Sequence, residues 1–182
     1  MQTLISFLRG VNITGHNSIK MRDLSALYND LGYNGAETYI QSGNVIFTEN
    51  DVEPVSDISL KIEKAIFQRF GFVVPVMIRT LQDMQKLVSV NPFLNENNFD
   101  PAKMAVLFLH EECKISQIEK VADISYPPDK FVIKEREIFI YCPNGFGRTK
   151  LYTTFFEQKM GVTGTARNWK TISTIIENAL NK

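Results

Sequence analysis

Apolar residues recur along the first 80 residues in two ways, as short continuous runs and as helical repeats. Short continuous runs predict buried strands, and repeats at three and four residues predict amphipathic helices. The predicted elements are a strand at 4–8, a helix at 21–31, strands at 37–41 and 44–48, a helix at 55–70 and a strand at 73–78. The two middle strands flank Ser42 and Gly43, a turn short enough for a hairpin. This order, βαββαβ, is that of a ferredoxin-like unit.

The same order begins again after residues 91–101, the stretch of the chain most typical of a loop. A short helix at 81–88 precedes this loop. After it we predict a strand at 104–109, a short helix at 115–121, strands at 130–134 and 137–141, and helices at 151–160 and 169–180. No strand is predicted between the last two helices, so a final strand is missing or replaced. Sequence identity between the halves is poor, so the repeat is one of element order.

We therefore predict an α+β fold of two ferredoxin-like halves with antiparallel sheets, arising from a degenerate internal duplication. The first half spans residues 1–89, and the second spans residues 101–182 and has an extra C-terminal helix. Several strands are apolar on both alternating faces, as Ile5 and Phe7 opposite Leu4 show. Because helices cover only one face of such a sheet, we expect the sister half or another subunit to cover the other.

The chain has 182 residues, and its 20 Lys plus Arg balance 20 Asp plus Glu, so the formal net charge is zero. A zero net charge leaves only local basic patches for nucleic-acid binding. Cys113 and Cys142 lie in no Cys-x-x-Cys or Cys/His cluster, which predicts reduced thiols and no bound metal. No signal peptide is apparent, and no apolar run approaches the roughly 20 residues of a membrane span. We therefore expect a cytoplasmic protein with no membrane partner.

Three polar segments combine glycine or asparagine with basic side chains just before a predicted helix, at residues 9–17, 144–150 and 163–170. Free N–H groups at a helix start and a nearby cation both favour a bound anion. Ordinary solvated loops share this composition, and that alternative stays open for each segment. The middle segment lacks the Gly-Lys-Ser/Thr ending of a P-loop, and the first lacks a dinucleotide fingerprint, so no cofactor is predicted.

The function predicted from these loops is the binding of a small anionic ligand, such as a nucleotide or a phosphorylated metabolite. Arginines would supply charge, and asparagine amides would supply orientation. The candidate residues expected to converge on one polar cleft are Arg9, Asn12, His16, Ser42, Asn44, Arg167 and Asn168. The alternative is that Arg9 and Arg167 only pair with surface carboxylates.

Two other classes of function stay open, an RNA-binding module and a structural or protein-interaction domain without catalysis. RNA-recognition domains stack bases on aromatic residues of the first and third strands, where Phe7 and Phe47 occur. The basic-Gly-aromatic signature of such domains is absent around Phe47, which favours core packing instead. No catalytic partner can be assigned to His16 from spacing, so enzymatic activity and oligomeric state are left open.

Three stretches of the chain stand out together: Phe7-Leu8-Arg9-Gly10-Val11-Asn12-Ile13, Tyr39-Ile40-Gln41-Ser42-Gly43-Asn44-Val45-Ile46-Phe47 and Thr165-Ala166-Arg167-Asn168-Trp169-Lys170-Thr171. They resemble the signature segments of a bacterial family catalogued as domain of unknown function 1697. The resemblance runs from the first strand to the last helix. It implies a compact α+β fold of two ferredoxin-like halves, and it implies no activity, substrate or catalytic residue.

Overall fold

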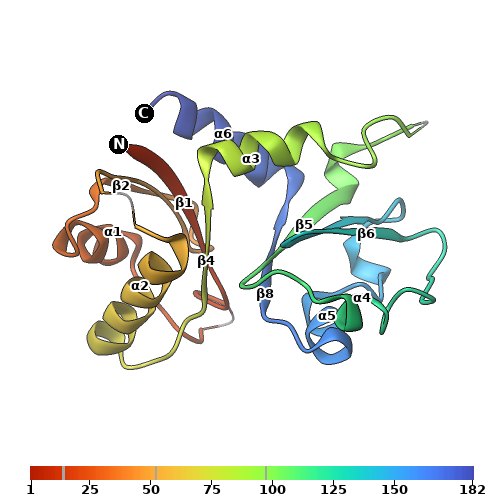
Figure 1. Ribbon diagram of the computed structural model, residues 1–182, viewed down its shortest axis with the longest axis horizontal. Coiled ribbons are helices and arrows are strands. Elements are labelled where there is room, and N and C mark those ends of the chain that lie inside the picture. Colours follow the sequence, from red (N-terminus) through yellow and green to blue (C-terminus); the bar gives the residue numbers. More distant parts are fainter. Residues whose placement is uncertain (14, 52, 97) are drawn as a thin grey trace. The chain divides into compact units, whose positions relative to one another are not determined.

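A computed structural model describes residues 1–13, 15–51, 53–96 and 98–182 of the chain. The chain divides into two compact units, which are Met1–Leu87 with Ile175–Lys182, and Val88–Thr174. Each unit holds a four-stranded antiparallel sheet (Figure 1). The strand orders are those of ferredoxin-like folds, so the predicted α+β fold of two such halves is confirmed. No helix of the described residues is both long enough and apolar enough to cross a membrane.

The first unit contains a sheet with the strand order β2-β3-β1-β4. Its elements are β1 Gln2–Leu8, α1 Met21–Asp30, β2 Asn34–Tyr39, β3 Asn44–Glu49, α2 Val55–Phe70, β4 Val76–Thr80 and α3 Leu81–Ser89. Helices α1 and α2 lie against one face of this sheet (Figure 1). The predicted domain limits, 1–89 and 101–182, stay a prediction.

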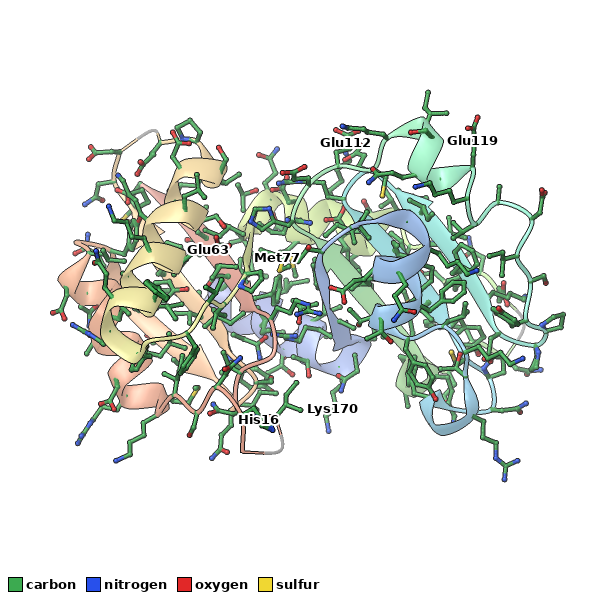
Figure 2. All side chains as sticks on the ribbon, turned by 90° about the horizontal axis from the view of Figure 1, so that it is seen from below. His16, Glu63, Met77, Glu112, Glu119 and Lys170 are labelled. Carbon is green, nitrogen blue, oxygen red and sulfur yellow. The ribbon has the colours of Figure 1, made fainter. Side chains whose placement is uncertain are left out.

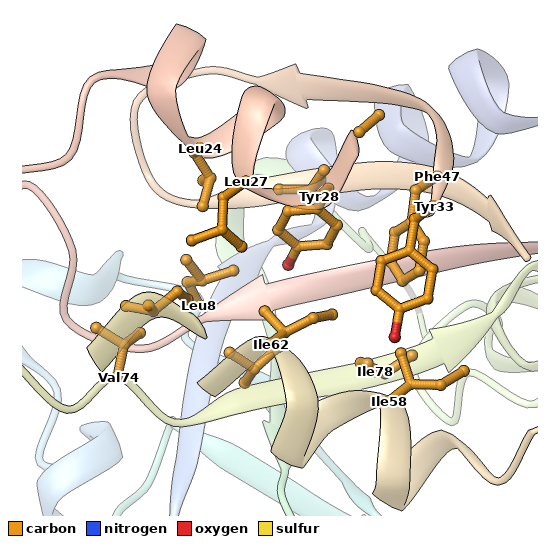
Figure 3. Packing of buried hydrophobic residues seen from close by; sticks show 14 of the residues in the cluster. Leu8, Leu24, Leu27, Tyr28, Tyr33, Phe47, Ile58, Ile62, Val74 and Ile78 are labelled. Atoms are coloured by element: carbon orange, nitrogen blue, oxygen red, sulfur yellow. The ribbon is translucent and has the colours of Figure 1, made fainter. Parts of the chain in front are cut away.

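The core of the first unit lies between the sheet and these two helices. Helix α1 contributes Leu24, Leu27 and Tyr28, and α2 contributes Ile58 among others (Figure 3). Their spacing of three and four residues places them on one side of each helix, where they pack on alternate strand residues. The Tyr28 hydroxyl and Ser6 Oγ share a buried hydrogen bond of 2.6 Å, which satisfies both polar groups.

The second unit contains a sheet with the strand order β6-β7-β5-β8. Its elements are η1 Pro101–Lys103, β5 Met104–Leu109, α4 Ile115–Ile118, β6 Lys130–Lys134, β7 Glu137–Tyr141, η2 Phe146–Arg148, α5 Thr153–Met160, β8 Gly164–Asn168 and α6 Trp169–Leu180. The part of α6 from Ile175 onward is grouped with the first unit. Buried residues of β5 and β7 pack with Phe156 and Met160 of α5 in the core of the second unit.

The second unit does contain a final strand, so the prediction of a missing or replaced strand is wrong. Strand β8 pairs antiparallel with β5 along its whole length, and segment 163–170 is therefore not a loop but a strand leading directly into α6. A Cβ at Gly164 would lie 2.8 Å from Leu107 Cδ1 and from the Phe108 carbonyl oxygen. This close approach needs glycine, and it leaves β8 without the apolar pattern that identifies other strands.

The first sheet has buried residues on both of its faces. Ile5 and Phe7 lie on the face opposite α1 and α2, and both are fully buried. Phe47 pairs with Leu4, whose side chain packs with the helices, so Phe47 faces away from Phe7. The two aromatic residues of the RNA hypothesis therefore lie on opposite faces and do not form a base-stacking pair. What covers the face opposite the helices stays a prediction.

Candidate functional site

Asn12, one of the predicted site residues, holds the loop that follows β1. Its amide nitrogen donates to the carbonyl oxygens of Ile19 at 3.0 Å and Gln41 at 2.9 Å. Its amide oxygen accepts a hydrogen bond of 2.9 Å from the Ile19 N–H. Both amide hydrogens are thus used within the protein. Through its hydrogen bond to Gln41, the Asn12 side chain links this loop to the turn between β2 and β3.

Ser42 and Asn44 lie in and after that same turn. Asn44 is fully buried, and its amide nitrogen donates to the Tyr39 carbonyl and to Ser42 Oγ, each at 3.0 Å. Through Gln41, the Asn12 side chain joins the same cluster. The structure therefore brings together three of the predicted residues, and the asparagine amides hold the backbone there.

Arg9 and His16 belong to the loop after β1 but not to this cluster of amides. The Arg9 side chain is half-buried, and the backbone N–H of Arg9 donates to the Pro75 carbonyl at 2.9 Å. His16 is exposed on the outer part of the loop (Figure 2), where its backbone N–H donates to the Ile13 carbonyl at 2.9 Å. Both side chains reach solvent, which a ligand contact requires.

Arg167 and Asn168 end β8 in the second unit. Asn168 caps α6, since its Oδ1 accepts a hydrogen bond of 2.8 Å from the Thr171 N–H. The sequence predicts Arg167 in a polar segment just before the helix, whereas in the structure it lies within strand β8 and is only 8% exposed. Its Nη1 donates to Thr165 Oγ1 at 2.7 Å and to the Ala166 carbonyl at 2.9 Å. Burial lowers the pKa of Arg167 to about 10, which leaves it charged at neutral pH.

The predicted residues are divided between the two units, with Arg167 and Asn168 in the second and the other five in the first. Within the first unit the structure joins Asn12, Ser42 and Asn44 through hydrogen bonds. Convergence of all seven residues on a single cleft stays a prediction.

Strand β4 carries a buried arginine that the sequence analysis missed. Arg79 is 1% exposed, and its Nη1 donates to the Ile78 carbonyl at 2.9 Å. Strands β4 and β8 take the same place in their sheets, each leads directly into a helix, and Arg167 makes the same bond to the residue before it. The sequence signal that could have identified Arg79 is a charged residue directly after the apolar run Val76, Met77 and Ile78. This repeat supports an internal duplication.

Segment 144–150 lines an open hollow of about 360 Å³ in the second unit, which we name the basic hollow. Its lining residues include Ser125, Tyr126, Asp129, Asn144, Arg148 and Lys150. The Arg148 and Lys150 side chains are exposed, and Lys150 Nζ lies 5.1 Å from the centre of the Tyr126 ring, within cation–π range. The sequence identified this segment as an anion-site candidate, but none of its residues is among the seven.

A buried thiol lies beside the acidic residue of this hollow. Burial raises the pKa of the Cys142 thiol, a hydrogen bond with Thr149 opposes the shift, and the charge and hydrogen bond of Asp129 add to it. Cys142 and Cys113 are both free thiols. In the described part of the chain, no three His, Cys, Asp or Glu side chains form a group that could hold a metal ion.

Comparisons with known proteins agree with this fold. The solved structure of conserved bacterial protein SP0830 from Streptococcus pneumoniae is similar over 99% of each chain, with a TM-score of 0.79 and 22% sequence identity. At that identity the likeness supports the fold alone. No curated protein matches the chain. The family described as "Protein of unknown function (DUF1697)" matches residues 1–139, about three quarters of the chain, so the protein belongs to this family.

Proposed function

We propose that the second unit binds a small anionic ligand, a nucleotide or a phosphorylated metabolite, in the basic hollow. The observation that carries this proposal is that two exposed cations, Arg148 and Lys150, line one hollow together with Asn144. Its volume of about 360 Å³ lies within the range of about 300 to 1,000 Å³ that is typical of small-molecule sites.

The chemistry of the lining suits a ligand with a phosphate and a planar ring. Arg148 offers a planar donor fork for phosphate oxygens, and Lys150 offers a compact charge. Lys103 adds a third cation, since its Nζ lies 3.5 Å from where a Cβ at Gly145 would be. The Tyr126 ring offers a stacking surface for a base. The Asp129 carboxylate disfavours a bare anion but can accept a hydrogen bond from a ribose hydroxyl.

The convergence of the seven residues predicted from the sequence stays a second proposal for the same class of ligand, and we call it the second location. The amides of Asn12 and Asn44 already donate to protein oxygens. Binding at that location would therefore depend on the charges of Arg9 and Arg167, with His16, Ser42 and Asn168 in supporting roles.

A thermal-shift titration with AMP and with inorganic phosphate tests both locations. AMP at 100 times its dissociation constant stabilises the protein by about 2.7 kcal/mol. Arg148→Ala and Lys150→Ala each weaken AMP binding by about tenfold, the usual loss for a charge-assisted hydrogen bond. Arg22→Ala, which removes an arginine with 90% exposure on α1, is the matched control and leaves AMP affinity unchanged.

Other results would redirect or overturn the proposal. Weakened binding in Arg9→Ala and Arg167→Ala, with Arg148→Ala unaffected, would move the ligand to the second location. The absence of any shift with AMP and phosphate would contradict both locations. RNA binding that falls steeply with salt would instead favour the RNA-binding alternative.

A further inference from the structure

Strand β6 is an end strand of the second sheet, and its outer edge borders a groove of about 590 Å³, the β6 groove. Pro92 and Phe93 line one side, Ile118, Val121 and Ile124 line the other, and residues 130–133 of β6 lie between them. Figure 1 shows β6 between the segment that follows α3 and helix α4. Because alternate strand residues face opposite sides of a sheet, four consecutive lining residues mean that the groove reaches β6 at its edge.

The pairing of the sheet shows which backbone groups of β6 face the groove. The Cys142 N–H, just past β7, donates to the Lys103 carbonyl at 2.9 Å, so even-numbered residues of β7 face β5. Odd-numbered residues of β7 therefore face β6, where they pair with residues 130, 132 and 134. The N–H and C=O groups of Phe131 and Ile133 consequently point away from β7. In the part of the chain that the structure describes, no hydrogen bond occupies these four groups.

The two sides of the β6 groove lie on opposite faces of the second sheet. Phe93 stacks on the Tyr141 ring with centroids 5.6 Å apart, on the face opposite α5. On the other face, the Phe131 ring packs edge-on against Phe156 of α5 at 5.2 Å, beside the buried Val121. A strand added to β6 would point alternate side chains toward each wall. Apolar residues on both faces of that strand would be buried.

The basic hollow continues the β6 groove at the start of β6, because Ser125, Tyr126 and Asp129 line both. A strand running antiparallel to β6 would end there, with its carboxyl end beside Arg148 and Lys150. We propose that the β6 groove binds an extended, apolar peptide of another protein antiparallel to β6, with the peptide's terminal carboxylate in the basic hollow. The placement of the carboxylate rests on the proposed anion-binding function, whereas the strand pairing does not.

A second copy of this chain fits the groove less well than such a peptide. Strand β6 reads Lys-Phe-Val-Ile-Lys, so two copies paired antiparallel about Val132 would set Lys130 of each opposite Lys134 of the other. Like charges directly opposite each other destabilise a strand pair. At the start of β6, the terminal carboxylate of a peptide carries the opposite charge to Arg148 and Lys150, the two exposed cations that line the basic hollow beside Asp129.

Fluorescein-labelled hexapeptides of alternating Val and Ile with a free C-terminal carboxylate serve as probes for the full-length protein. In fluorescence anisotropy, N-methylation is scanned through every position of the peptide. Loss of affinity by about tenfold or more at every second position is expected, because only alternate N–H groups face β6. Uniform tolerance of N-methylation, or no binding of any of these peptides, overturns the strand pairing.

A matched pair of variants on α4 tests the wall of the groove. Ile118→Glu, in the lining, weakens peptide binding by about tenfold because it places a charge against an apolar surface. Ile115→Glu, at a position with 77% exposure outside the lining, leaves binding unchanged. Equal effects of the two substitutions would contradict the groove assignment. Circular dichroism spectra of both variants establish that the fold is intact.

Amidation of the peptide's C-terminus separates the two proposals. Amidation weakens binding by about fivefold if the carboxylate contacts the exposed Arg148 and Lys150. Amidation without effect, with the period-two N-methyl pattern intact, overturns the carboxylate placement and leaves the pairing standing. If sedimentation analysis instead shows a dimer that dissociates in the Ile118→Glu variant, that result would assign the groove to a second copy of this chain and overturn the peptide proposal.

Discussion

The two units carry equivalent end strands, β2 and β6, and protect the edges of those strands differently. On β2 the Ser25 hydroxyl donates to the Ala36 carbonyl at 2.5 Å, and Lys182 Nζ pairs with Glu37 at 3.1 Å. A register shift also interrupts β2 after Asn34. On β6 the pairing with β7 is regular, and the outer N–H and C=O groups of its middle residues face a groove.

The difference follows from the helix that precedes each hairpin. Helix α1 has ten residues, and Ser25 in its middle reaches the edge of β2. Helix α4 has only four residues, and it forms one wall of the groove without capping the strand. An open edge invites pairing with other chains, and lysines at its two ends are a common guard against self-association. One topology therefore gives a capped edge in the first unit and an uncapped edge in the second.

The turn that joins β2 to β3 gives the largest expected effect on stability. A Cβ at Gly43 would lie 2.5 Å from Val11 Cγ2 and 2.7 Å from Leu8 Cβ, at a φ of +71°. Gly43→Ala therefore lowers the free energy of unfolding by about 3 kcal/mol, from overpacking together with left-handed strain. Urea denaturation measures this loss.

Gly147→Ala is the control for that substitution, since a Cβ at Gly147 has no atom within 4 Å. The control changes the free energy of unfolding by no more than about 0.5 kcal/mol. Equal losses in the two variants would show that the first hairpin is not locked by its turn.

The residue just before β2 makes the stability of the first unit sensitive to alkaline pH. Burial raises the pKa of Tyr33 to about 12, and Glu53 and Glu49 add to the shift. The pKa of Tyr33 in the folded protein lies above the unfolded value of about 10. The contribution of neutral Tyr33 to the free energy of unfolding is therefore complete below about pH 10 and is lost as pH rises through about 12.

Tyr33→Phe should flatten the fall in unfolding free energy between pH 10 and 12 relative to the unchanged protein. Tyr152→Phe, which alters a tyrosine with 51% exposure, is the control and should not flatten it. Denaturation measured across this pH interval tests the comparison, and parallel curves for all three proteins would rule out the assigned cause.

Removing the cap on the β2 edge has a smaller expected effect. Ser25→Ala deletes the donor to the Ala36 carbonyl, at a cost of about 1 kcal/mol. The better helix propensity of alanine offsets this cost by up to about 0.5 kcal/mol. Hydrogen exchange at β2 should accelerate while exchange at β6 stays unchanged. Unaltered exchange at β2 would mean that Ser25 does not guard the edge.

The periodic elements of the fold could be predicted from the sequence, and β8 could not. Helix α2 and strands β6 and β7 have the predicted limits because their apolar spacing is set by the surface they bury. Strand β8 has only one aliphatic residue, Ala166, and its position depends on the close approach of Gly164 to Leu107. Such an approach is a property of the folded partner strand, which the local sequence does not contain.

Only the residue types of the candidate site could be predicted from the sequence, and their arrangement in space could not. The sequence identified the segment with Arg148 and Lys150 as suited to anions, and the structure places both side chains in one hollow. The sequence did not reveal that the amides of Asn12 and Asn44 donate to backbone carbonyls, since those carbonyls lie on other segments. Nor did it reveal the β6 groove, because an open edge depends on what the rest of the fold fails to cover.

The turn between β6 and β7 gives the smallest expected effect and completes the contrast between the two hairpins. Glu135 adopts a φ of +53°, a left-handed conformation that costs glutamate more than it costs asparagine. Glu135→Asn should raise the free energy of unfolding by about 0.5 kcal/mol, measured by urea denaturation beside Gly43→Ala. Glu135→Gly should stay within about 0.5 kcal/mol of the unchanged protein, because glycine relieves the strain but adds freedom to the unfolded chain. A loss of stability in Glu135→Asn would mean that contacts of the Glu135 side chain outweigh its backbone strain. In that case the second hairpin, like the first, would be held by a contact specific to its turn.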